Sequence, residues 1–133
     1  MKILHHLLLS ILFTSSFLWV TAKPLTVFFG TGGRGAEGIY QATFNPANGK
    51  FTPAELAAKI GSPGFLALHP NGKILYSIGR WEDGSGALGY HIQKNGALEE
   101  FTRMICPDGG GCHISVHPSG KFLLTAQYGG GSV

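Results

Sequence analysis

One twelve-residue pattern occurs twice in this chain, and the two copies start 48 residues apart. Residues 65–76 read FLALHPNGKILY, and residues 113–124 read HISVHPSGKFLL. Each copy consists of two short apolar runs joined by a turn, which is typical of strands rather than helices. A strand-built repeat of about forty to fifty residues is typical of a β-propeller, in which each repeat forms one four-stranded blade. The sequence therefore predicts an all-β fold, a β-propeller.

The length of the chain fits only part of such a ring. A propeller has about four to eight blades, whereas 133 residues hold only two full 48-residue repeats and a fraction. We therefore expect a partial propeller of antiparallel blades, an N-terminal fragment of the whole. One blade can be read completely, with strands at residues 65–69, 74–78, 88–92 and 98–105. An earlier copy, with strands at residues 25–29 and 38–44, lacks the first strand of its blade.

The first 22 residues predict a secretory signal peptide. A polar start with Lys2 precedes an apolar or hydroxyl-bearing run over residues 7–20, and small residues follow before Lys23. The alternative, a membrane anchor, is less favoured because the run is shorter than the roughly 20 residues that span a bilayer. We expect residues 23–133 to be the propeller domain, exported to the periplasm or secreted, with no stable membrane insertion.

Charge and cysteine content exclude several classes of partner. The formal net charge of +3 is scattered along the chain without a basic run, so no nucleic-acid partner is predicted. Cys106 and Cys112 flank a Pro-Asp-Gly-Gly-Gly segment; a disulfide is one alternative in an oxidising compartment, and two separate thiols are the favoured one. Two cysteines without further paired ligands are poor evidence for zinc. We predict neither a metal site nor a cofactor.

Two local motifs compete with the propeller interpretation. Residues 30–35 read GTGGRG and imitate the dinucleotide-binding fingerprint, but residues 39–44 alternate like a strand where that motif needs a helix. Residues 52–55 resemble a helix capping box, yet their place in the repeat is that of a fourth strand. We favour the strand, because a helix of about eight residues is marginal and tertiary context overrides such a propensity.

The two copies of the repeat agree at their turns. At a few positions they carry residues with different chemical properties. Both His-Pro pairs, at His69 and His117, begin type I turns and are interpreted as structural. The positions that differ are Phe65 against His113, Gly79 against Gln127, and Arg80 against Tyr128. His113 begins the innermost strand of its blade and could face the central channel, with a charge that changes near neutral pH. A purely structural histidine remains the alternative.

The C-terminal segment resembles a known family. Residues 112–133, CHISVHPSGKFLLTAQYGGGSV, are similar to the signature segment of the lactonase family of seven-bladed propellers, the 6-phosphogluconolactonase type, which is related to carboxymuconate-cyclising enzymes. Residues 38–40, 51–53 and 62–70 fall in the family's order and spacing. The resemblance extends over nearly all of residues 23–133 and corresponds to the N-terminal third of a full propeller.

The resemblance implies a reaction and a set of site residues. The reaction is hydrolysis of a sugar lactone in carbohydrate metabolism: water attacks the ring carbonyl, a base takes its proton, and donors stabilise the oxyanion. By matching positions, His113 is the candidate catalytic residue. The candidates for binding a small lactone are Arg34, for an anionic group, and Gln127, Tyr128, Gly129 and Gly130. Gln127 departs from the asparagine usual in the family, which puts a contact inherited at that position in doubt.

Three alternatives to this function remain open. The signal peptide departs from a cytoplasmic pentose phosphate role, so the substrate is not fixed and a carboxymuconate-cyclase-like enzyme stays possible. A non-catalytic exported propeller that binds a ligand or protein would have the same fold. The third alternative is a truncated, inactive chain. The glycines at residues 129–131 are themselves ambiguous, because a flexible hairpin loop is favoured over an anion-binding nest.

Overall fold

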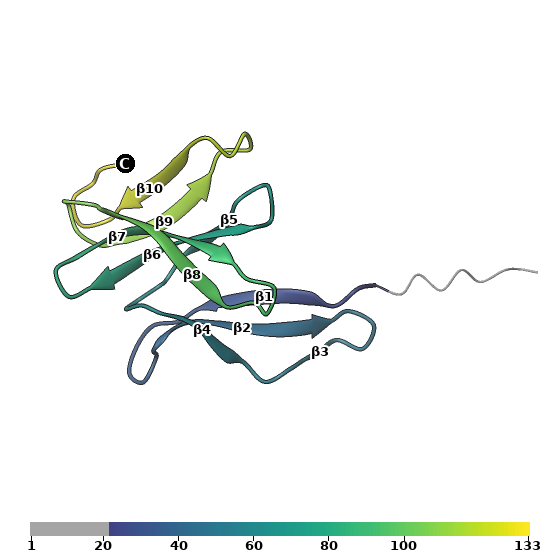
Figure 1. The fold of residues 1–133 in the computed structure, drawn as a ribbon. Coiled ribbons are helices and arrows are strands. Elements are labelled where there is room, and N and C mark those ends of the chain that lie inside the picture. The colour runs from purple at the N-terminus through teal and green to yellow at the C-terminus, as the bar shows by residue number, and fades with distance from the viewer. Residues whose placement is uncertain (1–21) are drawn as a thin grey trace, which may run out of the picture.

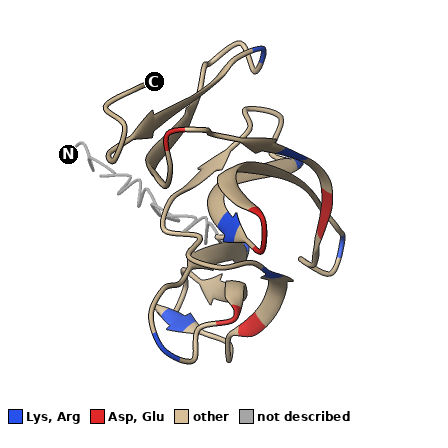
Figure 2. Cartoon of the chain, turned by 90° about the vertical axis from the view of Figure 1, so that its left-hand side faces the viewer, with Lys and Arg blue, Asp and Glu red and all other residues tan. Residues whose placement is uncertain are grey.

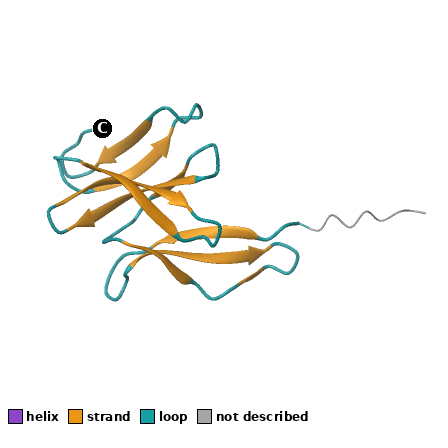
Figure 3. Cartoon of the chain, in the orientation of Figure 1, coloured by secondary structure: helices purple, strands orange, loops and turns teal. Residues whose placement is uncertain are grey.

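The computed structural model describes residues 22–133, which form ten strands and no helix (Figures 1 and 3). The all-β prediction is confirmed. The predicted signal peptide, apart from Ala22, lies outside the described part of the chain. Within residues 22–133 there is no helix long and apolar enough to cross a membrane.

The first sheet is a blade without its first strand, as predicted. Strands that are close in the sequence are paired. The first strand pairs with the second, and the other edge of the second strand pairs with both of the short strands that follow. The strands are β1 (Leu25–Gly30), β2 (Gly38–Asn45), β3 (Lys50–Phe51) and β4 (Glu55–Lys59). Residues 55–59 are thus a strand, as favoured over the helix.

The second sheet is a complete four-stranded antiparallel blade in the order β5-β6-β7-β8. Its strands are β5 (Leu66–Leu68), β6 (Ile74–Trp81), β7 (Gly84–Ile92) and β8 (Leu98–Ile105). The last strand matches its predicted bounds. β6 and β7 are longer than predicted because their pairing continues to Trp81 opposite Gly84, with only a two-residue hairpin between them.

A third, two-stranded sheet consists of β9 (Gly111–Val116) and β10 (Leu123–Gln127). The turn between these strands repeats the turn between β5 and β6. Gly72 N–H donates to His69 O at 2.9 Å, and Gly120 N–H donates to His117 O at 2.8 Å. In each turn the histidine Nδ1 also accepts an N–H two residues on, at 3.1 Å. The geometry supports the structural interpretation of both His-Pro pairs.

The apolar core lies between neighbouring sheets. Ile39, Leu88 and Tyr90 belong to a buried cluster that joins the first sheet to the second. Ile78 and Ile114 belong to another, which joins the second sheet to the third. This face-to-face packing of successive blades is expected of a propeller.

Two kinds of connection lie at opposite ends of the sheets. The loops that follow β1, β6 and β10, together with those that precede β5 and β9, lie at the left in Figure 1. We call this the loop end; it comprises residues 31–37, 61–65, 82–83, 106–110 and 128–131. The turns near residues 69–72 and 117–120 lie at the other end. Figure 2 views the loop end directly, and charges of both signs are interspersed over it.

Candidate functional site

His113 lies near the start of β9, close to the loop end. Its backbone is paired with Ala126 of β10, and its side chain is exposed. The imidazole ring lies 5.0 Å from the ring of Phe65, measured between centroids, at an interplanar angle of 56°. The two residues at equivalent positions of the repeat are therefore neighbours across adjacent blades, and the histidine keeps a solvent-accessible ring.

A β-bulge lies directly before His113. The register pairs His113 with Ala126 and Gly111 with Gln127, so Cys112 is the extra residue in β9. Its exposed thiol contacts Ala126 O at 3.5 Å. A bulge bends the strand and changes the direction of neighbouring side chains, and bulges are frequent beside functional sites. This irregularity was not predicted, because no sequence motif marks it.

Gln127 ends β10, and its side chain is buried, with only 5% of the residue exposed. The side-chain amide donates from Nε2 to Thr125 Oγ1 at 2.8 Å. The other amide atom, Oε1, has no hydrogen-bond partner among residues 22–133. A buried carbonyl oxygen without a donor is rare, so this acceptor is a candidate to receive a hydrogen bond from a ligand or water.

Tyr128, Gly129 and Gly130 form a tight turn after β10. Gly131 N–H donates to Gln127 O, and Gln127 N–H donates to Ser132 O, each at 2.9 Å. Tyr128 is 87% exposed. A hairpin turn is the interpretation favoured from the sequence, and the hydrogen bonds agree with it.

Asp108 lies against this turn and was not singled out from the sequence. A Cβ added at Gly130 would lie 2.2 Å from Asp108 Cβ and 2.8 Å from Asp108 Oδ2. The residue belongs to the loop that precedes β9, whereas Gly130 follows β10. Only the pairing of these two strands brings the loops together, so no signal in the sequence could have identified the contact. The Asp108 carboxylate thus lies beside Gly130, one of the predicted binding residues.

Arg34 lies apart from the other candidates in the chain fold. It is exposed in the β1–β2 loop of the first sheet, between Gly33 and Gly35, which have φ of 97° and 78°. Within the described chain, no hydrogen bond or ion pair links Arg34 to His113 or Tyr128. The structure thus brings His113, Gln127 and the 128–130 turn into one sheet and leaves Arg34 on another blade, at the same end.

The two cysteines are separate free thiols in the structure. Cys106 Sγ lies 3.8 Å from Thr125 Oγ1, and Cys112 contacts the carbonyl of Ala126. The alternative favoured from the sequence, two thiols without mutual contact, agrees with these partners. No group of three or more histidine, cysteine, aspartate or glutamate side chains that could hold a metal ion occurs in residues 22–133.

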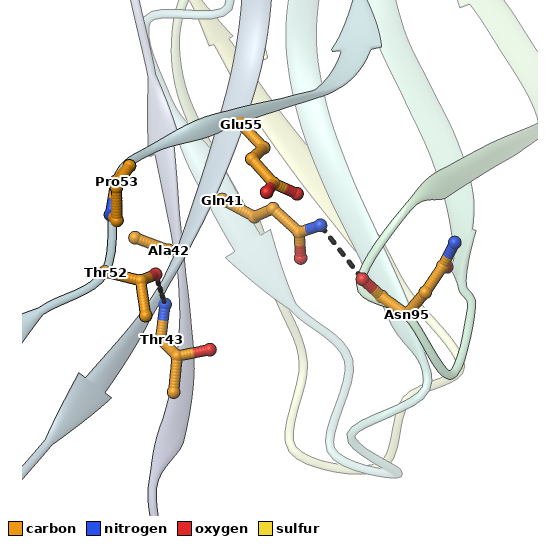
Figure 4. Close-up of a pocket in the computed structure, with 7 residues that line it drawn as sticks. All are labelled: Gln41, Ala42, Thr43, Thr52, Pro53, Glu55 and Asn95. Carbon is orange, nitrogen blue, oxygen red and sulfur yellow. Dashed lines mark hydrogen bonds between the residues drawn. The ribbon is translucent and has the colours of Figure 1, made fainter.

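A pocket of about 230 Å³ lies beside β2, away from the predicted residues (Figure 4). Gln41 Nε2 donates to Asn95 O at 2.9 Å across it, which ties the first sheet to the β7–β8 turn. Thr43 N–H donates to Thr52 Oγ1 at 3.0 Å. Glu55 is the only charged side chain that lines this pocket, so the pocket does not suit an anionic ligand.

Comparison with known proteins places the chain in a family. The family described as "Lactonase, 7-bladed beta-propeller" matches residues 26–133. A 6-phosphogluconolactonase of Bacillus subtilis is 36% identical over 100 residues, which are 74% of this chain and 29% of the relative. A 6-phosphogluconolactonase of Formosa agariphila is 32% identical over 97 residues, which are 68% of this chain and 27% of that relative.

A solved structure agrees with the fold. The crystal structure of a putative 6-phosphogluconolactonase from Bacteroides fragilis superposes with a TM-score of 0.71 at 25% identity, over 84% of this chain and 31% of that one. The chain therefore spans less than a third of the relatives and of the solved structure that it matches. With ten strands in successive antiparallel sheets and a family match over residues 26–133, this chain belongs to the lactonase family of seven-bladed β-propellers.

Proposed function

We propose that the protein containing these blades hydrolyses a lactone, with a sugar δ-lactone as the substrate class. The observation that carries the proposal is family membership over residues 26–133, together with 36% identity to the 6-phosphogluconolactonase of B. subtilis. Because the chain spans 29% of that relative, the activity is proposed for a ring in which these blades take part.

His113 is the proposed general base. Its imidazole takes a proton from the water that attacks the lactone carbonyl and forms the tetrahedral intermediate. As the C–O ring bond breaks, the imidazolium returns this proton to the ring oxygen, which leaves as a hydroxyl group and restores the neutral base. The exposed ring beside Phe65 supports this role, because a base must reach substrate and solvent.

The turn after β10 provides proposed partners for the oxyanion. The exposed Tyr128 hydroxyl can donate a hydrogen bond, and the exposed residues Gly129 and Gly130 can donate from their backbone N–H groups. Donors that are already positioned stabilise developing negative charge in the transition state.

The test compares two histidine substitutions in the natural protein that contains these blades. His113→Gln is expected to lower kcat for δ-lactone hydrolysis about 100-fold or more, since general-base catalysis contributes on that order. His117→Gln is the control, because His117 serves its own turn and leaves the site unchanged. Equal activities of the two variants would exclude His113 as the base. A wild-type rate no higher than spontaneous hydrolysis would reject the lactonase proposal in favour of a binding propeller.

We also propose that the protein is exported, on the basis of the apolar run at residues 7–20 and the small residues before Lys23. Mass spectrometry of the protein recovered from the periplasm or medium is expected to show a mature N-terminus at Lys23. Recovery of uncleaved protein from the cytoplasm alone would contradict export.

A further inference from the structure

A second, smaller cavity lies at the loop end, where the second and third sheets meet. Its volume is about 80 Å³, and none of the residues predicted from the sequence lines it. A water molecule in the liquid takes about 30 Å³, so the cavity has room for one oxyanion group but not for a sugar ring. The lining residues are Ser62, Ile78, Gly79, Arg80, Ser85, Gly110 and Gly111.

Arg80 supplies the only charged side chain of this lining. It forms no ion pair within residues 22–133, where both salt bridges involve other residues. A Cβ built at Gly110 would lie 3.9 Å from Arg80 Nη2, so the guanidinium group lies over the glycine backbone. A planar guanidinium without a carboxylate partner is well suited to bind a carboxylate or phosphate through two hydrogen bonds.

The backbone that carries Arg80 is held firmly. Arg80 N–H donates to Gly61 O at 2.7 Å, and Gly61 N–H donates to Arg80 O at 3.1 Å. A Cβ at Gly61 would lie 2.8 Å from Arg80 O, so this close bridge requires glycine. A fixed backbone reduces the conformational freedom that a binding side chain loses on contact with a ligand.

Ser62, next to this bridge, has a strained backbone conformation. Its φ of 51° is the only positive value of a residue other than glycine in the described chain. Strained backbone conformations of this kind are concentrated at functional sites. Together with Ser85, which is paired with Arg80 in the register, Ser62 places a hydroxyl-bearing residue beside the same cavity.

Two glycines complete the lining and leave backbone accessible. A Cβ at Gly111 would lie 2.8 Å from Ile78 Cγ2, so a side chain there would enter the cavity wall. Gly110 lies outside the strands and donates no backbone hydrogen bond within residues 22–133. Glycine N–H groups next to a cation are typical of anion-binding concavities.

We propose that Arg80, with Ser62, Ser85 and the Gly110–Gly111 backbone, forms a subsite for an oxyanion group of the substrate, a phosphate or a carboxylate. This inference rests on the proposed lactone hydrolysis and assigns the recognition of a negatively charged substrate group to Arg80 and the residues around it. Arg80 occupies the repeat position of Tyr128, so the subsite and the proposed oxyanion donors lie at equivalent ends of adjacent blades. Arg80 is thus a residue that determines specificity rather than a catalytic residue.

The first measurement is binding of inorganic phosphate to the natural gene product by isothermal titration calorimetry. Arg80→Gln is expected to weaken phosphate binding about 10-fold to 100-fold, since a charge-assisted hydrogen bond contributes on that scale. Lys94→Gln removes the same charge at the opposite end and is expected to leave the affinity unchanged. Arg80→Lys retains the positive charge but cannot form two parallel hydrogen bonds to one oxyanion. This variant provides the test if Arg80→Gln fails to fold. Equal affinity of wild type and both Arg80 variants would overturn the proposal.

The second measurement is kcat/KM for three lactones: a phosphorylated δ-lactone, a carboxylate-bearing lactone and neutral δ-gluconolactone. Arg80→Gln is expected to lower kcat/KM about 10-fold or more for one charged lactone, which identifies the group, and not for the neutral one. A uniform effect on all three would overturn the subsite while leaving lactone hydrolysis intact. If phosphate binding depends on Arg80 but none of the lactones is hydrolysed, the proposed function is rejected while the anion subsite is supported.

Discussion

At the scale of single residues, two buried hydroxyl groups are notable between the first and second sheets. Tyr90 is 1% exposed and Ser77 is fully buried, and neither hydroxyl has a hydrogen-bond partner of good geometry in residues 22–133. Burial raises the pKa of the Tyr90 phenol above its usual 10.0, and the nearby Ser77 hydroxyl lowers it by less. The phenol is therefore neutral wherever the chain is folded at ordinary pH.

The raised pKa predicts a loss of stability in alkali. Above about pH 10 the unfolded chain releases the phenol proton while the folded chain retains it, so the free energy of unfolding falls as pH rises toward the folded pKa. The slope for one group is at most about 1.4 kcal/mol per pH unit. Urea unfolding at pH 9 and pH 11 is expected to show a smaller loss for Tyr90→Phe than for wild type. Tyr128→Phe, at an exposed position, is the control, and an equal loss in Tyr90→Phe would contradict the assignment.

At the level of secondary-structure elements, the repeat places a glycine near the start of the equivalent strand in the first and the second sheet. Gly38 begins β2, and Gly86 occupies the equivalent position 48 residues later, near the start of β7. A Cβ at either glycine would lie 2.0 Å from a carbonyl of the outer strand, Ala58 O or Met104 O. The backbone on both sides of the contact is paired, so it cannot move away at low cost.

Gly86→Ala is therefore expected to destabilise the chain by about 1–3 kcal/mol or more, the usual cost of overpacking. Gly32→Ala is the matched control, because nothing lies within 4 Å of its added Cβ and its φ is not positive. The free energies of unfolding in urea would be compared. Equal stability of the two variants would show that the outer strand adapts to the added methyl group.

The strands were predictable where local signals and the repeat agreed. The bounds of β8 and the His-Pro turns followed from alternation and turn residues. The repeat correctly predicted strand β4, although residues 52–55 resemble a helix capping box. The sequence did not reveal the bulges at Cys112 and in β8, where the register shifts between Gly89 and Tyr90. Bulges arise from pairing between two strands, so one strand's sequence does not determine them.

At the scale of the whole molecule, apolar side chains remain exposed on the sheets. Leu25 on β1 is 54% exposed, Met104 on β8 is 68% exposed, and Leu124 on β10 is 51% exposed. An apolar cavity of about 290 Å³ also lies between β1 and the strands β5 and β6. Surfaces of this kind are covered by neighbouring blades in a closed ring.

We predict that the 133-residue chain, expressed alone, does not hydrolyse δ-gluconolactone above the spontaneous rate. Its blades match less than a third of the relatives' length, and a site at the centre of a ring needs groups from several blades. The measurement is a lactone-opening assay on the purified chain, with a 6-phosphogluconolactonase as positive control. Hydrolysis that disappears in His113→Gln would contradict the prediction and show that these blades suffice.

The strand content, the blade period, the turns and the family can all be inferred from the amino-acid sequence, because each depends on local alternation, turn chemistry or a repeated pattern. The sequence also singled out His113 as a residue whose chemistry differs from that of its repeat partner. Only the tertiary structure revealed that Asp108 lies against Gly130, that Gln127 is buried, and that Arg80 shares a cavity with the strained Ser62. These contacts join loops that are distant in the chain, and packing between blades, not local sequence, brings them together.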